Sequence, residues 1–235
     1  MIIDFYAHYG CGPGMPGCYS PDELLKLQKA AGVELTVASD LGAALGDAKN
    51  AEIPDGLVRF EGVKPHVDLA SLGQPNGIRI YPTLQEWDLD GQAMADLLAI
   101  AKQRGIIVQV CLRLQDPRVM LQAVPSGTVI AALDRVIEAH RDVKFVISGA
   151  NLGEVRGNKS PFLRENAWTD ISHLQHPTNS LQKLMETLGS SKLLFASNSP
   201  IFYPHMAVFR MLHSAISDED RERILSRNAR TLLNL

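Results

Sequence analysis

The sequence predicts a single (β/α)8 barrel, in which eight parallel strands alternate with helices around one core. Short β-branched, apolar runs alternate with longer segments of helical periodicity, which is typical of βα units and a parallel sheet. The candidate strands number eight, and no composition shift or linker divides residues 1–235 into two domains. A chain of 235 residues is short for this fold, so we expect some helices to be short or missing.

Each predicted strand is a short apolar run bounded by turn-forming residues. The runs are Ile2–Ala7, Glu34–Ala38, Leu57–Val63, Gly77–Tyr81, Ile106–Leu112, Lys144–Ser148, Ala167–Ile171 and Lys192–Ala196. The fifth run is apolar along nearly its whole length, as expected of a strand that is covered on both faces. The connections between strands three and four, and between six and seven, are where a helix is expected to be short or absent.

Helical periodicity and capping residues mark the connections. Ser20 is a candidate N-cap, Pro21 suits the first helical position, and Gly32 suits the position after the helix. The other predicted helices are Leu41–Ala51, Gln92–Arg104, Thr128–His140, Ser180–Leu188, Tyr203–Ala215 and Asp218–Leu233. A doubly wound open sheet is the alternative architecture. Its nucleotide-binding forms have no support, because no P-loop or GxGxxG motif follows a strand.

Composition and charge exclude several function classes. The chain has 46% hydrophobic residues, and 23 basic residues against 26 acidic ones give a net charge of −3. This balance, without a basic run, predicts no nucleic-acid partner and no anionic membrane surface. No apolar stretch is long enough to span a bilayer, and the first residues do not resemble a signal peptide. We therefore expect a cytoplasmic protein.

The three cysteines, Cys11, Cys18 and Cys111, are an odd number without CxxC spacing. The simplest interpretation is three reduced thiols in a cytosolic protein. The alternative is a Cys11–Cys18 bridge across the loop of residues 10–19, which is rich in glycine and proline.

Polar side chains lie at the predicted carboxyl ends of the strands, which face the pocket of such a barrel. In chain order they are Tyr6, His8, Arg79, Tyr81, Cys111, Arg113, Asn151, Asp170 or His173, and Asn198. Guanidinium groups bind carboxylate or phosphate in bidentate fashion, so this set predicts a site for a small anionic or polyhydroxylated molecule.

Each of these residues also has a purely structural interpretation. Arg79 and Arg113 could pair with acidic residues and only hold the rim of the barrel. His8 could be a hydrogen-bonded histidine of the barrel interior, and Cys111 a small buried apolar residue. His173 and His176 are expected to lie in solvent in the loop after the seventh strand.

Several of these strand ends resemble the amidohydrolase-related family, a group of TIM barrels that contains metal-dependent hydrolases, lactonases and non-oxidative decarboxylases. Ile2–His8 resembles the opening IIDxHxH motif, and Gly77–Pro82 is similar to GIRLxP on strand four. Leu193–Pro200 resembles LLFGSDxP on strand eight, and Asn228–Arg230 lies within a match to the closing NAxRLL helix. The resemblance covers nearly the whole chain and implies the same barrel fold.

The resemblance also shows a systematic departure at the metal ligands. It implies two histidines on strand one, one each on strands five and six, and an aspartate on strand eight. Those positions read Tyr6, His8, Cys111, Gly149 and Asn198, so only His8 is retained. A catalytic zinc takes about three protein ligands, which this set does not supply. The segment Gly105–Val119 resembles uncharacterised relatives with a small residue for the strand-five histidine followed by LRxxDxR, so we expect no metal or other cofactor.

Two functions remain open from the sequence. In the first, the barrel is a metal-free pseudoenzyme or sensor that binds a small anionic or lactone-like molecule through Tyr6, Arg79, Tyr81, Cys111, Arg113 and Asn151. In the second, it is a metal-independent hydrolase of the lactonase type, with His8 as general base oriented by Tyr6 or Asp170 and with Arg79 or Arg113 stabilising the oxyanion. Asn198 is the other candidate catalytic residue. A purely structural or partner-binding barrel is a third interpretation. Members of the family commonly form dimers, so a homodimer is also an expectation.

Overall fold

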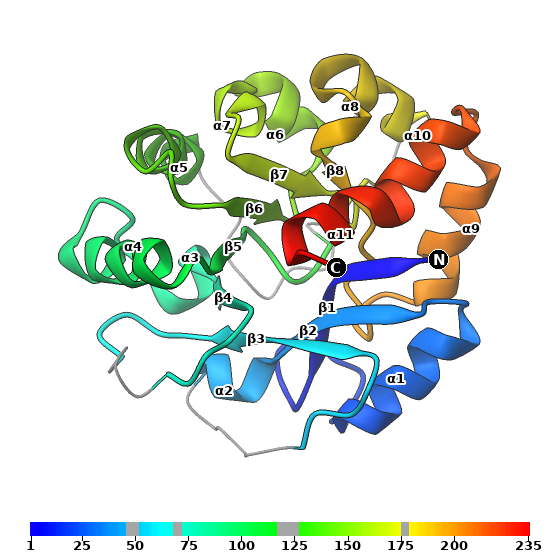
Figure 1. Ribbon diagram of the computed structural model, residues 1–235, viewed down its shortest axis with the longest axis horizontal. Helices are drawn as coiled ribbons and strands as arrows, with labels where there is room; N and C mark the ends of the chain where they lie inside the picture. The colour runs from blue at the N-terminus through cyan, green and yellow to red at the C-terminus, as the bar shows by residue number, and fades with distance from the viewer. Residues whose placement is uncertain (46–51, 68–71, 117–126, 175–178) are drawn as a thin grey trace.

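The computed structural model describes residues 1–45, 52–67, 72–116, 127–174 and 179–235. Within these ranges eight strands form one sheet in the order β1 to β8, and each neighbouring pair is parallel. The strands are β1 (Ile3–Tyr9), β2 (Leu35–Asp40), β3 (Leu57–Gly62), β4 (Gly77–Ile80), β5 (Ile107–Cys111), β6 (Phe145–Ser148), β7 (Ala167–Asp170) and β8 (Leu193–Leu194). The chain therefore has the (β/α)8 barrel that its sequence predicts (Figure 1).

Backbone hydrogen bonds between β1 and the segment that begins with β8 close the barrel. Phe5 N donates to Phe195 O over 2.9 Å, and His8 N donates to Ser199 O over 2.8 Å. Asp4 lies at this seam and is fully buried. Its Oδ1 accepts from the backbone of Tyr6 and of Ser197, each over 3.0 Å. Burial nevertheless raises the pKa of Asp4 to about 6.

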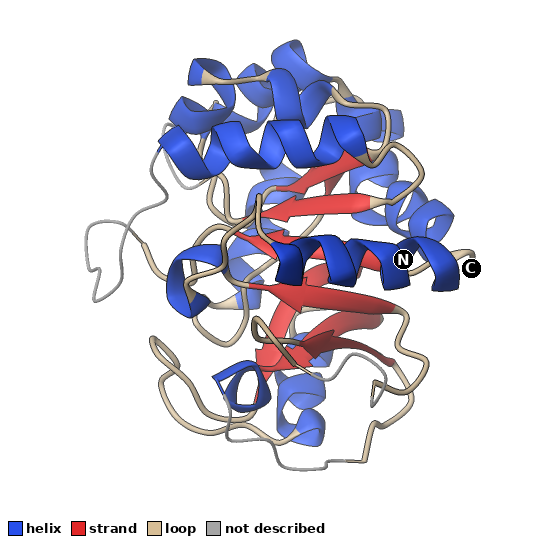
Figure 2. Cartoon of the chain, turned by 90° about the vertical axis from the view of Figure 1, so that its left-hand side faces the viewer, coloured by secondary structure: helices blue, strands red, loops and turns tan. Residues whose placement is uncertain are grey.

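Helices surround the strands (Figure 2). They are α1 (Pro21–Ala30), α2 (Leu41–Leu45), α3 (Pro82–Gln85), α4 (Gln92–Arg104), α5 (Gly127–Ala139), α6 (Leu152–Gly157), α7 (Ser160–Leu163), α8 (Ser180–Leu188), α9 (Pro204–His213), α10 (Asp218–Glu222) and α11 (Asn228–Leu233). A 3-10 turn at Ser190–Lys192 precedes β8, and a π-helical turn at Arg223–Arg227 joins α10 to α11. In the described part of the chain, no helix combines the length and the apolar content that crossing a bilayer requires.

Most predicted helices are confirmed, two of them with their predicted bounds (α4 and α8). The helix predicted over Leu41–Ala51 is observed as far as Leu45, and residues 46–51 lie outside the described ranges. The predicted helix Asp218–Leu233 is instead the succession of α10, the π-helical turn and α11. The connection between β6 and β7 contains only the short helices α6 and α7, as the chain length led us to expect.

The barrel interior holds an apolar layer near its amino-terminal end. Ile3, Phe5 and Phe60 belong to this layer, and the rings of Phe5 and Phe60 meet edge to face at 5.7 Å. Ala229 and Leu232 from α11 pack against the same layer, so the last helix closes this end of the barrel. The polar strand ends lie at the other end.

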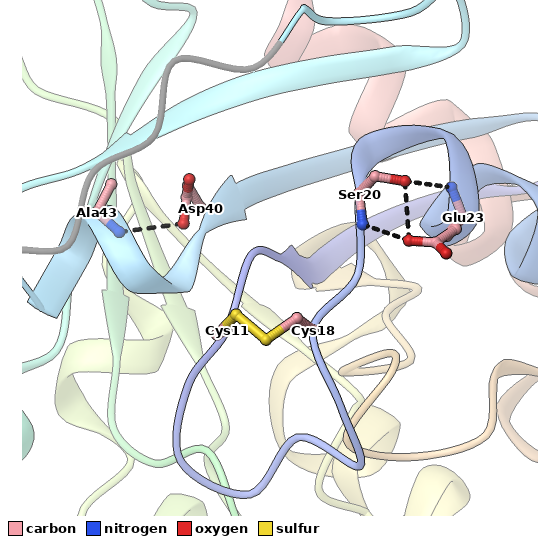
Figure 3. The surroundings of a disulfide bond; sticks show 6 residues. All are labelled: Cys11, Cys18, Ser20, Glu23, Asp40 and Ala43. Carbon is pink, nitrogen blue, oxygen red and sulfur yellow. Dashed lines mark hydrogen bonds between the residues drawn. A yellow bond between two sulfur atoms is a disulfide. The ribbon is translucent and has the colours of Figure 1, made fainter.

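The loop after β1 carries a disulfide between Cys11 and Cys18 (Figure 3). The expectation of three reduced thiols is therefore wrong for these two cysteines, because the loop turns back on itself and Gly10 pairs with Tyr19 in an antiparallel bridge. Cys111 is free and buried. The cytoplasmic location expected from the sequence stays a prediction.

The loop closed by the disulfide lies over the carboxyl-terminal mouth of the barrel. Its Met15 packs on an apolar cluster that includes Tyr6, Tyr81 and Cys111. Gly14 has a φ of +80°, and a Cβ there would come within 2.7 Å of the Gln115 side chain, so only glycine allows this approach. Beyond the loop, Ser20 caps α1 in a capping box with Glu23, as its sequence predicts.

Candidate functional site

His8 lies at the carboxyl end of β1 with both ring nitrogens facing polar groups. Its Nε2 lies 3.0 Å from Asn198 Oδ1, while Asn198 Nδ2 donates to Leu114 O over 2.6 Å. Asn198 Oδ1 is therefore the acceptor and His8 Nε2 the donor. His8 Nδ1 faces Arg79 Nη1 at 3.5 Å and Tyr81 Oη at 3.4 Å. Burial and the nearby guanidinium hold the pKa of His8 well below its usual 6.5.

Arg79 is fully buried on β4 and points into the barrel. Its Nη1 donates to Ala7 O over 2.7 Å and to Ser39 Oγ over 2.9 Å, and its Nε donates to Gln109 Oε1 over 2.8 Å. The guanidinium carbon lies 5.0 Å from the centre of the Tyr6 ring, a cation–π contact. No Asp or Glu in the described ranges forms a salt bridge with it, so the structural alternative of an acidic partner for Arg79 is not observed.

Arg113, which follows β5, does have the acidic partner that its structural interpretation required. Its Nη1 donates to Glu154 Oε2 over 2.8 Å and to Gly149 O over 2.8 Å, and its Nη2 pairs with the other oxygen of Glu154. Asn151 is the N-cap of α6 and forms a capping box with the same Glu154. Both residues thus hold the rim between β5 and β6.

Tyr6, Tyr81 and Cys111 form the apolar wall of the mouth under the disulfide loop. Tyr6 Oη donates to Arg113 O over 3.1 Å, and its ring meets His8 edge to face at 4.7 Å. Burial raises the pKa of Cys111 to about 12 and also raises the pKa of both phenols. Cys111 therefore remains a thiol at neutral pH, as the structural interpretation of this residue expected.

The backbone at Gly149 does not fit a histidine. Its φ is +78°, and a Cβ there would lie 3.0 Å from Arg113 O and 3.3 Å from Arg113 N. The ligand that the family resemblance implies for strand six would therefore strain the backbone and make unusually tight contacts with the neighbouring segment. Glycine at this position is thus required by the backbone conformation and by the close approach of Arg113.

The remaining residues of the implied ligand set do not fit a divalent cation either. Asn198 Nδ2 donates to Leu114 O, and Asn198 Oδ1 accepts from His8 Nε2. The cationic Arg79 lies beside the other ring nitrogen of His8, Nδ1. Within the described ranges, no three or more His, Cys, Asp or Glu side chains gather as they would around a metal ion. A divalent ion here would meet a fixed positive charge without a carboxylate to balance it.

Asn198→Asp is expected to lower the free energy of unfolding at pH 7 by about 2–3 kcal/mol. The new carboxylate would direct one of its oxygens at Leu114 O, and it would bury a charge that makes no salt bridge, because Arg79 contacts His8 and not residue 198. Urea denaturation followed by circular dichroism measures the change.

The matched control is Asn151→Asp, which keeps an equally good N-cap for α6 and should change stability by less than about 1 kcal/mol. Equal stability of Asn198→Asp and the wild type would contradict the role given to the Leu114 hydrogen bond.

A second polar group lies at the ends of β7 and β8, and the sequence analysis only partly identified it. Ser172 donates its backbone N–H and its hydroxyl to Asp170 Oδ1 over 2.9 and 2.6 Å, and its Oγ lies 3.1 Å from His173 Nδ1. His173 is buried beside Phe202, so the expectation that it lies in solvent is wrong. Burial, together with Arg113, lowers the pKa of His173 to about 3. His176 lies outside the described residues.

Four buried side-chain atoms at this end of the barrel have no hydrogen-bond partner in the described part of the chain. They are Arg113 Nε, Asp170 Oδ2, His173 Nε2 and Ser199 Oγ. Three of the residues follow the ends of β5, β7 and β8, and Asp170 is the last residue of β7. Buried polar atoms are nearly always paired, so each of these atoms indicates a position where water or a ligand completes the hydrogen bond.

A cavity of about 640 Å³ lies at the opposite end of the barrel, between the segment before β4, the end of α4 and the end of α11. Its lining includes no Asp, Glu, His or Cys. It therefore lacks the groups needed for acid–base chemistry, and the candidate site remains at the carboxyl-terminal mouth.

Comparisons with known proteins agree with this fold. The family model described as Amidohydrolase matches residues 70–235. No curated protein matches the chain.

Three similar solved structures cover nearly all of the chain. A 2,6-dihydroxybenzoate decarboxylase from Rhizobium is 16% identical with a TM-score of 0.73, covering 99% of this chain and 98% of its own. A putative 2-pyrone-4,6-dicarboxylic acid hydrolase from Pseudomonas putida is 19% identical with a TM-score of 0.71, covering 99% and 97%. A dihydroxybenzoic acid decarboxylase from Polaromonas sp. JS666, solved with manganese and 2-nitroresorcinol, is 14% identical with a TM-score of 0.74, covering 100% and 97%. These likenesses concern the fold.

Proposed function

The chain belongs to the amidohydrolase family, and from that premise we propose that its barrel has lost the metal centre and binds a small anionic or lactone-like molecule as a pseudoenzyme or sensor. The ligand lies at the carboxyl ends of β5, β7 and β8. The unpaired buried atoms of Arg113, Asp170, His173 and Ser199 support this position most directly. They offer both donors and acceptors, which suits a molecule with several oxygen atoms.

Electrostatics favour an anion over a cation at this site. Arg79 keeps a positive charge inside the barrel without a carboxylate partner in the described ranges. Glu154 balances the charge of Arg113, but Arg113 Nε remains available as a donor. Asp170 opposes this preference only partly, because burial raises its pKa and so disfavours its charged form. Two of the similar solved structures are named for anionic ring compounds: the decarboxylase from Rhizobium for 2,6-dihydroxybenzoate, and the putative hydrolase from Pseudomonas putida for 2-pyrone-4,6-dicarboxylic acid. Anionic rings are therefore the first probes to test.

The alternative of a metal-independent hydrolase with His8 as general base receives less support. A general base needs a free lone pair within reach of a water molecule and a pKa near the working pH. His8 Nε2 is committed to Asn198, its Nδ1 faces the Arg79 cation, and its pKa lies well below 6.5. The surroundings of His8 therefore favour a barrel that binds its ligand without converting it.

Elemental analysis tests the metal-free part of the proposal. Protein purified without chelator is expected to contain no stoichiometric zinc, manganese or iron, and a chelator is expected to leave its melting temperature unchanged. One divalent ion per chain, or a melting temperature that falls with the chelator, would overturn this part.

A thermal-shift titration tests the ligand site, with 2,6-dihydroxybenzoate, 2-pyrone-4,6-dicarboxylate and gluconate as probes. At 100 times its Kd, a ligand of the folded state adds about 2.7 kcal/mol, which raises the melting temperature of a chain of this size by at least about 5 °C. The shift should disappear in the double variant His173→Gln/Ser199→Ala. It should persist in Ser226→Ala, a buried serine whose hydroxyl donates to Glu222 O.

Stabilisation that survives in the double variant would place the ligand elsewhere, and three probes without effect would count against an anionic site. Turnover of the pyrone by the wild type that is lost in His8→Ala would instead favour the hydrolase.

A further inference from the structure

The four unpaired atoms of the proposed ligand site are enclosed by the protein. Arg113, Asp170, His173 and Ser199, the residues that carry them, are only 3, 1, 7 and 0% exposed. A ligand that reaches these atoms must therefore displace part of what covers the mouth of the barrel. The disulfide loop, residues 10–19, packs over this mouth, so its movement would change access to the site.

The disulfide loop lies against two of the segments that carry the unpaired atoms. Met15 of the loop and Ile201 both pack on an apolar cluster that contains Leu114. Leu114 directly follows Arg113, and Ile201 is two residues beyond Ser199. Lifting Met15 from this cluster would therefore uncover the segments that follow β5 and β8.

The loop is fixed at its base and joined across by the disulfide (Figure 3). Gly10 N donates to Tyr19 O over 2.7 Å, and Tyr19 N donates to Gly10 O over 2.9 Å. Just beyond this pair, the Cys11–Cys18 bond links the two limbs of the loop. The loop contains no charged side chain, so no ion pair helps to hold it in place. The disulfide and the packing of Met15 therefore hold the tip of the loop on the mouth.

The disulfide itself is open to attack, because both Cys11 and Cys18 are exposed. A dithiol reductant can therefore reach the bond without unfolding the chain. One thiolate of the reductant attacks a sulfur atom, which breaks the S–S bond and forms a mixed disulfide. The second thiol of the reductant then displaces the protein sulfur and closes a disulfide within the reductant. The reductant leaves oxidised, and the two cysteines take up the two protons that its thiols release.

We propose that the Cys11–Cys18 disulfide is a redox control on the ligand site. In its oxidised form the bond keeps Met15 on the mouth of the barrel, and its reduction by a dithiol frees the loop and opens the mouth. Removing a cross-link from so short a loop restores conformational freedom that favours the open loop by on the order of 10–100-fold. This role of the disulfide rests on the proposed ligand site, but the movement of the loop can be measured without any ligand.

Alkylation of Cys111 by iodoacetamide measures the opening, because this buried thiol belongs to the cluster under Met15. Peptide mass spectrometry reports each cysteine separately. In wild type with the disulfide formed, Cys111 is expected to react slowly. Its rate should rise at least about 10-fold in wild type that has been reduced with dithiothreitol and desalted, and equally in Cys11→Ser/Cys18→Ser. Met15→Ala should raise the rate while the disulfide remains intact.

Leu133→Ala controls for a general loss of stability, because Leu133 is buried on α5 in a cluster separate from the one around Cys111. Cys111 should stay protected in this variant although its melting temperature falls. Equal Cys111 rates in oxidised and reduced wild type would overturn the proposal. So would an equal rise in Leu133→Ala, or protein purified in air that carries no Cys11–Cys18 bond.

Binding of 2,6-dihydroxybenzoate separates the redox control from the ligand site itself. Its association rate, followed by stopped-flow fluorescence, is expected to rise at least about 10-fold when the wild type is reduced. If Cys111 responds to reduction but the probe binds neither form, the loop opens as proposed and the anion site fails. If the probe binds both forms at the same rate, the anion site stands and the disulfide does not control it.

Discussion

Arg79→Ala is expected to lower the free energy of unfolding at pH 7 by about 3–5 kcal/mol. The guanidinium is fully buried and donates to Ala7 O, Ser39 Oγ and Gln109 Oε1. Removing it leaves these acceptors unpaired, opens a cavity and ends the contact with the Tyr6 ring.

Urea denaturation of Arg79→Ala and of Arg79→Lys separates charge from geometry. Lysine keeps the positive charge but cannot reach three acceptors in one plane, so most of the loss should remain. Arg135→Ala is the control, because Arg135 is exposed and pairs with Asp90 on the surface, so its removal should leave the free energy of unfolding nearly unchanged. If Arg79→Ala behaves like this control, Arg79 does not brace the barrel interior.

The barrel could be predicted because a parallel strand covered on both faces has a strong sequence signal. Ile106–Leu112 is such a run, and β5 is observed at Ile107–Cys111 within it. The end of the chain could not be predicted in detail. The π-helical turn at Arg223–Arg227 has i→i+5 hydrogen bonds, and a single such turn is too short to leave a recognisable periodicity in the sequence.

The location of the polar strand ends also followed from the sequence, because all parallel strands end on the same side of a barrel. Their hydrogen-bond partners did not follow. Glu154, which engages both Arg113 and Asn151, lies on α6, a helix too short to leave an amphipathic pattern. Gln109, the partner of Arg79, lies inside a strand that reads as apolar. Partners brought together from distant segments are set by register and rotamer, which the local sequence does not encode.

The buried histidine that follows β7, His173, shows the same limit and has a measurable consequence. A histidine in a polar loop is usually solvated, and only the folded structure, with the ring of Phe202 beside it, reveals that His173 is buried. Its pKa is lowered to about 3, whereas an unfolded histidine titrates near 6.5. Below pH 6.5 the unfolded state therefore binds more protons than the folded state, and stability falls as the pH falls.

Wild-type protein is thus expected to lose about 1.4 kcal/mol per pH unit relative to His173→Gln between about pH 6 and pH 4, or about 2 kcal/mol at pH 5. The effect of His173 is the difference in unfolding free energy between wild type and His173→Gln at each pH. This difference is needed because Asp4, whose pKa is raised to about 6, makes both proteins more stable as the pH falls. Urea denaturation at pH 7.5, 6, 5 and 4.5 gives the two curves, with the exposed His205→Gln as control. Parallel curves for wild type and His173→Gln would mean that His173 binds protons equally well in the folded and unfolded states. His173 would then not be a buried neutral member of the polar group that it forms with Asp170 and Ser172.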